Sequence, residues 1–284
     1  MAYSMEISRQ NKALFLFLLD QSFSMEDPMA NSSNRKGDDL VGAINAWLQN
    51  LSITCAKAEG FKDFFDISII GYGTDEHSNP IVESALVGPL AGREMVTISE
   101  IAENPARIET VTAFLPDDET GELLEMPQQM PIWIDPVCRG ATPICTTLVK
   151  ACEIVDNWIA EHPNSFPPIV INITDGEASD GDPIPYAEAL RERGTNDGNV
   201  LFFNCCLSST AADPFLFRGN GEVLPDDFAK SLFEMSSVLP ESVIAKARAA
   251  GQDLEPNSRG MAYNADMVSL IKFLDVGTRA AVLR

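Results

Sequence analysis

The chain is predicted to adopt an α/β fold built on a parallel, doubly wound sheet. Apolar, strand-like runs alternate along the sequence with segments of helical periodicity, as expected when parallel strands are connected by helices. The runs are apolar at successive positions, which is typical of central strands covered on both faces. With 284 residues, 45% of them hydrophobic, the chain can form a sizeable core. Because no linker or internal repeat divides it, we predict one domain over 1–284.

Four segments are predicted as strands. Residues 13–19 (ALFLFLL) are continuously apolar and form the first. Residues 64–72 (FFDISIIGY) form the second, 168–174 (PIVINIT) the third, and 199–207 (NVLFFNCCL) the fourth. All four are short, rich in β-branched and aromatic residues or leucine, and bounded by polar or turn-forming residues.

Helices are predicted between and after these strands. Residues 38–56 and 143–160 place apolar side chains at helical spacing on one face. In the second of these segments the stripe consists of Ile144, Cys145, Leu148, Cys152, Val155 and Ile159. Segments 183–193, 226–237 and 264–275 are predicted as further helices.

Residues 75–140 interrupt this rhythm and contain seven prolines. Within them, 111–115 and 123–126 flank a polar, turn-forming segment, which predicts a β-hairpin-like excursion. Between Glu103 and Glu125 there are seven acids and one base. A solvated loop is favoured over a partner-binding arm for this acidic part. Residues 239–262 are predicted to be irregular.

Charge and cysteine usage exclude several classes of protein. There are 42 acidic against 20 basic residues, a net charge of −22, which argues against nucleic acid or an anionic membrane as partner. The apolar run 13–19 is shorter than the roughly 20 residues of a spanning helix and is a poor signal peptide. The six cysteines form no C-x-x-C pair, so no standard zinc site is indicated. Because no export signal is recognised, we expect reduced thiols and a cytoplasmic protein.

Oxygen-bearing side chains follow two of the predicted strands. Asp20, Ser22 and Ser24 come directly after the first strand, and Asp175 follows the third in a T-D-G sequence. In a doubly wound sheet, ligands bind at the carboxyl ends of the strands, where the strand order reverses. We therefore expect these side chains to converge there.

Thr142 joins this set as the predicted N-cap of helix 143–160, with Pro143 as the first helical residue. The candidate metal ligands are Asp20, Ser22, Ser24, Thr142 and Asp175. All offer oxygen, which selects Mg²⁺, Mn²⁺ or Ca²⁺ over zinc or copper. Three hydroxyls and two carboxylates leave an open coordination position, which suits octahedral Mg²⁺ or Mn²⁺ better than Ca²⁺.

These three motifs, in this order, resemble those of the von Willebrand factor A-type domain, where they form the metal-ion-dependent adhesion site. The resemblance implies that Ser22, Ser24 and often Thr142 contact the metal directly and that Asp20 and Asp175 act through water. It implies that a partner's carboxylate takes the last position. It also implies a sheet with one antiparallel edge strand and helices on both faces. The alternative, that the two acids merely cap helices, does not account for the three hydroxyls.

Two features refine the resemblance. The residue between the two serines is usually small, but here it is Phe23, for which inward packing is favoured over contact with a ligand. The tail from Arg259 to Asn264, with a closing helix to about residue 280, is similar to that of intracellular bacterial members encoded in tellurium-resistance and stress gene clusters. The implied partners are a kinase, a phosphatase or another protein of such a cluster.

The predicted function is a non-enzymatic, metal-dependent protein-binding module, an adaptor in a bacterial stress or defence system. The sequence has no G-x-S-x-G or Walker A motif and no histidine in the site motifs. A metal-dependent hydrolase or phosphatase that uses the same carboxylates is the alternative, with Glu177 as its only sequence-adjacent base. A third possibility is a scaffold with a vestigial site.

Overall fold

The computed structural model describes residues 3–5, 7–57, 60–116, 123–209, 212–219, 223–249 and 254–279. Its strands are β1 (Ala13–Asp20), β2 (Ala56–Lys57), β3 (Gly60–Phe61), β4 (Phe65–Thr74), β5 (Pro80–Ser84), β6 (Val96–Thr97), β7 (Arg107–Pro116), β8 (Leu123–Ile132), β9 (Ile169–Thr174), β10 (Gly194–Thr195), β11 (Gly198–Asn199), β12 (Leu201–Leu207), β13 (Phe215–Leu216) and β14 (Met261–Ala265). Its helices are α1 (Lys36–Cys55), α2 (Ile98–Glu103), α3 (Ile144–Glu161), α4 (Ile184–Glu192), α5 (Asp227–Met235), α6 (Glu241–Ala249) and α7 (Met267–Arg279), with 3-10 turns η1 (Phe23–Glu26) and η2 (Gly88–Leu90).

One eight-stranded sheet organises the chain, with the order β13-β14-β12-β9-β1-β4-β5 and β6 beside β4. The five strands from β14 to β4 run parallel, which confirms the predicted α/β class. The predicted antiparallel edge strand is β5, paired with β4. The short strands β6 and β13 are antiparallel as well, and were not predicted because two residues carry no periodicity.

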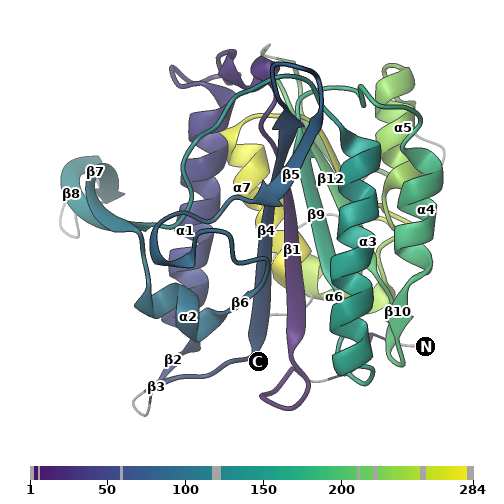
Figure 1. Cartoon of the computed structure of the whole chain (residues 1–284), viewed down its shortest axis with the longest axis horizontal. Helices are drawn as coiled ribbons and strands as arrows, with labels where there is room; N and C mark the ends of the chain where they lie inside the picture. The colour runs from purple at the N-terminus through teal and green to yellow at the C-terminus, as the bar shows by residue number, and fades with distance from the viewer. Residues whose placement is uncertain are drawn as a thin grey trace.

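The central strand β1 separates two apolar cores. Phe15 and Phe17 point into a core shared with α1 and α7, whereas Leu14, Leu16 and Leu18 point into one shared with α3 and α4. The helices accordingly cover both faces of the sheet (Figure 1). A strand buried on both faces must be apolar at every position, which explains the uninterrupted run in the sequence.

The predicted helix 143–160 is present as α3, one residue later, but its predicted N-cap is wrong. The residue that precedes the helix is Pro143, and neither it nor Thr142 supplies a side-chain cap. Instead the carboxylate of Asp180, in the loop after β9, accepts hydrogen bonds from the backbone N–H groups of Cys145 (3.0 Å) and Thr146 (2.9 Å). A carboxylate can accept both bonds and also favours the positive end of the helix dipole, so it caps better than a hydroxyl.

The acidic excursion contains a long hairpin. β7 and β8 pair antiparallel from Arg107↔Ile132 to Pro116↔Leu123 and project from the side of the molecule (Figure 1). The predicted strands 111–115 and 123–126 lie within this ladder, while residues 117–122, most of the predicted turn, lie outside the described residues.

Residues 239–262 are less irregular than predicted, since they contain α6 and the start of β14. The missed signal is the spacing of Val243, Ile244 and Ala247, which are all buried on one face of α6. Across the described residues no helix combines the length and apolarity needed to cross a membrane. All six cysteines are described and none takes part in a disulfide. The adjacent Cys205 and Cys206 face different apolar clusters, as expected for neighbours on a strand.

The capping arrangement predicts unequal effects of two substitutions near the start of α3. Asp180→Ala should lower the free energy of unfolding by about 1 kcal/mol, because two N–H groups of the first turn lose their acceptor. Thr142→Ala should cost less, since it leaves both capping bonds in place. Urea unfolding followed by circular dichroism measures both, and a larger loss for Thr142→Ala would contradict the assignment.

Candidate metal centre

Four of the five predicted ligands lie together at the carboxyl ends of β1 and β9. These strands are parallel neighbours with Leu19 opposite Ile173, so the residues that follow them emerge side by side. Asp20 is the last residue of β1, and Asp175 directly follows β9. Ser22 and Ser24 lie in the short turn that includes η1. The predicted convergence is therefore present.

Hydrogen bonds fix these side chains relative to one another. Asp20 accepts through Oδ1 from the backbone N–H of Ser22 (2.8 Å) and through Oδ2 from the hydroxyl of Thr174 (2.6 Å). The Ser24 hydroxyl donates to Asp175 Oδ1 (2.6 Å) and lies 3.0 Å from the Ser22 hydroxyl. The result is a cluster of carboxylate and hydroxyl oxygens drawn from two strand ends. Thr174 was not predicted to belong to it.

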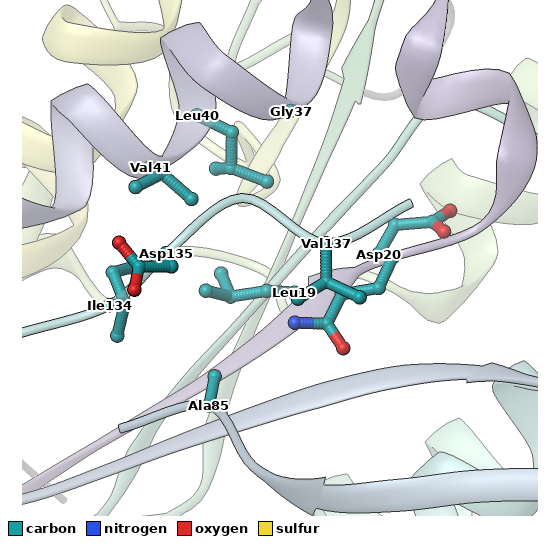
Figure 2. A pocket seen from close by; sticks show the side chains of 10 residues that line it. Leu19, Asp20, Gly37, Leu40, Val41, Ala85, Ile134, Asp135 and Val137 are labelled. Carbon is teal, nitrogen blue, oxygen red and sulfur yellow. The ribbon is translucent and has the colours of Figure 1, made fainter. Parts of the chain in front are cut away.

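Asp20 carries a buried carboxylate. Burial raises its pKa to about 6, because the charged form loses contact with water and hydrogen bonds offset only part of that loss. The carboxylate points away from the apolar side chains of Leu40, Val41 and Ile134 that line the adjacent recess (Figure 2). That recess has a volume of about 10 Å³, room for one water molecule.

The loop before Thr142 is anchored to the same end of the sheet. Gly140 has a φ of +65°, and a Cβ there would lie 2.1 Å from the Thr74 hydroxyl at the end of β4, so only glycine fits. Its carbonyl accepts from the N–H of Phe23 (3.0 Å), and Ala141 donates its N–H to Thr74 Oγ1 (2.9 Å). The loop therefore contacts both β4 and η1.

Thr142 itself is buried, and its backbone carbonyl accepts from the N–H of Ser179 (2.9 Å). Within the part of the chain that the structure describes, no hydrogen bond joins its hydroxyl to Ser22, Ser24 or Asp175. The geometry therefore brings four of the predicted ligands into one network and leaves the fifth beside it.

Lys36, the first residue of α1, was not predicted to belong to the site. Its Nζ lies 2.5 Å from Asp175 Oδ2 and 3.8 Å from Asp27 Oδ2. The Lys36 side chain is 5% exposed and that of Asp175 is fully buried, so the pair is withdrawn from water. The sequence feature that indicates its role is a lysine at the start of a helix. A positive charge there is unfavourable to the helix dipole, so an interaction elsewhere is expected to hold it.

The oxygen set fits Mg²⁺ in two respects. Magnesium bonds oxygen at 2.0–2.1 Å in octahedral geometry, which places neighbouring ligand oxygens about 3 Å apart, and the Ser22 and Ser24 hydroxyls are separated by 3.0 Å. Asp20 and Asp175 supply the negative charge that a divalent ion requires. The described ranges hold no group of three or more His, Cys, Asp or Glu side chains that could bind a metal, and the candidate site combines two carboxylates with hydroxyls.

From the sequence, inward packing of Phe23 under the loop is favoured, and the structure contradicts this. Its side chain is 63% exposed, between the two serines that border the cluster. The 3-10 turn η1 buries Met25 instead, which leaves Phe23 on the outside. An apolar ring therefore lies on the surface beside the candidate ligands.

Comparison with solved structures finds distant similarities to pilus proteins, three of which are described below. No protein-family model and no curated protein match the chain. The vWF domain of the type V pili tip protein Mfa5 from Porphyromonas gingivalis is 12% identical, with 60% of this chain and 39% of that one covered and a TM-score of 0.30. The pilus adhesin SpaC from Lactobacillus rhamnosus GG is 9% identical (97% and 31% covered, TM-score 0.44), and the PilB minor pilin from Streptococcus sanguinis is 10% identical (95% and 61%, TM-score 0.40). The chain spans less than two thirds of each of these structures, and the similarities are too low to add to what the topology shows.

The bond between Thr174 and Asp20 predicts a specific loss of stability. Thr174→Val keeps the shape of the side chain but leaves a buried Asp20 oxygen without its donor, which should cost about 1–3 kcal/mol in the free energy of unfolding. In an Asp20→Ala background the same substitution should cost less. Denaturant unfolding of the four proteins in this cycle measures the coupling, and equal losses in both backgrounds would refute it.

Proposed function

We propose that this chain is a non-enzymatic, metal-dependent protein-binding module of the von Willebrand factor A type. The observation that carries the proposal is the cluster of Ser22, Ser24 and Asp175 oxygens beside Asp20, with two hydroxyls at the separation of neighbouring ligands on magnesium. Ser22, Ser24 and the two aspartates would hold Mg²⁺ or Mn²⁺, with Thr142 as a further ligand. The ion, when bound, supplies an electrophilic position for a partner's carboxylate.

The surface around the cluster supports recognition of a protein. Phe23 offers an exposed aromatic ring next to the ligands, and aromatic side chains are enriched where proteins bind one another. The recess beside Asp20 has room for about one water molecule and is too small to enclose a small-molecule substrate. A partner would therefore approach from outside and present one side chain to the metal.

The negative charge of the chain restricts the surface charge that a partner can have. At a net charge of −22, an acidic protein would be repelled at long range. The partner should place a single Asp or Glu at the metal within a surface that is otherwise basic or apolar. The cytoplasmic stress-adaptor role, with a kinase, phosphatase or other cluster protein as partner, belongs to this proposal and has its support in the resemblance of the motifs and of the closing strand and helix.

One observation favours the hydrolase alternative. A cavity of about 230 Å³ lies beside the start of α3 and is bordered by Glu177, the candidate base, together with Asp182 and Asp227. The residues that line this cavity do not include Asp20 or Asp175, whereas the Ser22, Ser24 and Asp175 oxygens form one hydrogen-bonded cluster. Binding is therefore the better-supported function. Hydrolysis of a generic phosphoester with Mg²⁺ or Mn²⁺, lost in Glu177→Gln, would favour the alternative.

Metal should stabilise the folded chain, because only the fold assembles the ligands. At a metal concentration ten times the dissociation constant, the free energy of unfolding should rise by about 1.4 kcal/mol. Differential scanning fluorimetry with millimolar Mg²⁺ or Mn²⁺ measures the resulting increase in Tm. Ser24→Ala should lose this increase, whereas Thr54→Ala, which removes an exposed hydroxyl near the far end of α1, should keep it. An unchanged Tm with every divalent ion would contradict a metal site.

Partner binding should require both the metal and the serines. Affinity capture is performed with the wild type, Ser24→Ala and Thr54→Ala, each with Mg²⁺ and with EDTA. The specific partner is the protein retained by the wild type and Thr54→Ala in Mg²⁺ and lost from the other samples. Alanine substitution of the partner's surface acids should then identify one whose loss weakens binding far more than its neighbours do. Binding that survives EDTA undiminished would exclude a metal bridge.

A further inference from the structure

We propose that Lys36 is an intramolecular competitor of the metal: its ammonium group pairs with Asp175 in the metal-free protein and leaves that carboxylate when the metal binds. This inference rests on the proposed function, since it concerns the same site. It assigns a regulatory role to a residue outside the adhesion motifs. The consequence is a site that takes up metal only when the ion is abundant enough to displace the lysine.

Both carboxylate oxygens of Asp175 are already engaged by neighbouring side chains. Ser24 donates to Oδ1 at 2.6 Å and Lys36 occupies Oδ2 at 2.5 Å, so both oxygens already have a partner. The carboxylate is fully buried and the lysine nearly so, which leaves little room for a third group to approach without moving one of the two. Because a metal ion and an ammonium group seek the same negative charge, binding of one weakens binding of the other.

A second acceptor is available to the displaced lysine. Nζ of Lys36 already lies 3.8 Å from Asp27 Oδ2, and the Asp27 side chain is 63% exposed. The Lys36 backbone N–H donates to the Asp27 carbonyl at 2.9 Å, which keeps the two residues together. The flexible four-carbon stem of lysine could carry the ammonium group from the buried Asp175 to the exposed Asp27 with the backbone unchanged.

The stability of α1 does not explain why a lysine occupies position 36. Lys36 is the first residue of the helix, where a positive charge opposes the helix dipole, and Arg35 before it provides no side-chain cap. The acids that favour this end of the helix are Asp38 and Asp39 in the first turn. The position of Lys36 is therefore accounted for by its pairing with Asp175, inside the cluster.

The test compares Mn²⁺ binding by isothermal titration calorimetry in three full-length proteins. Lys36→Met removes the charge and keeps a similar unbranched stem. Lys12→Met is the matched control, since Lys12 also pairs with a buried aspartate, Asp66, at 2.8 Å, just before the opposite end of β1. We expect Lys36→Met to bind Mn²⁺ about tenfold or more tightly than the wild type, because the competing charge is gone. Lys12→Met should bind as the wild type does.

The outcomes separate this inference from the proposed function. Equal or weaker Mn²⁺ binding by Lys36→Met, with binding by the wild type intact, would overturn the role of Lys36 alone. Absence of binding by all three proteins would overturn the metal site and, with it, the inference.

A second measurement uses only the wild type, so it tests the inference even if Lys36→Met fails to fold. Reductive methylation followed by mass spectrometry reports how accessible each lysine is. Mg²⁺ should increase methylation of Lys36, which is released toward Asp27, and leave Lys12 unchanged. Lys36 that stays equally protected at saturating Mg²⁺ would refute displacement.

Discussion

The register in which β1 pairs with β9 determines which side chains meet at the candidate metal centre. With Leu19 opposite Ile173, Asp20 and Thr174 end neighbouring strands and hydrogen-bond at 2.6 Å. Because side chains alternate between the faces of a sheet, a shift of one residue would turn either of them toward the opposite core. The same register sets where the loops with Ser22, Ser24 and Asp175 begin. The packing of the two apolar cores therefore also determines the geometry of the site.

The parts of this arrangement that could be predicted depend on local sequence. β1, α1 and α3 are long and strongly patterned, and the position of Asp20 and Asp175 at strand ends follows from where apolar runs stop. The rest depends on packing between distant segments. Whether Lys36 reaches Asp175 depends on how the start of α1 lies against the end of β9, a contact between residues 139 positions apart. The cap of α3 by Asp180 likewise comes from another loop, which no local propensity indicates.

Buried charge gives the site a structural role as well. The pair of Lys36 and Asp175 is shielded from water, and removal of one partner of such a pair typically costs about 3–5 kcal/mol because the other charge is left unpaired. The hydroxyl of Ser24 donates a hydrogen bond to Asp175, and that of Thr174 donates one to Asp20. Residues that would bind metal are therefore also residues that hold the ends of two central strands together, and their effects on folding and on binding have to be measured separately.

The two outermost strands of the main sheet have a consequence for assembly. β5 begins with Pro80, which lacks an N–H to donate, and carries the exposed Glu83, while β13 consists of two residues. Proline, charge and short length are features that discourage another chain from adding a strand to an open edge. A sheet protected in this way resists growth by sideways hydrogen bonding between copies.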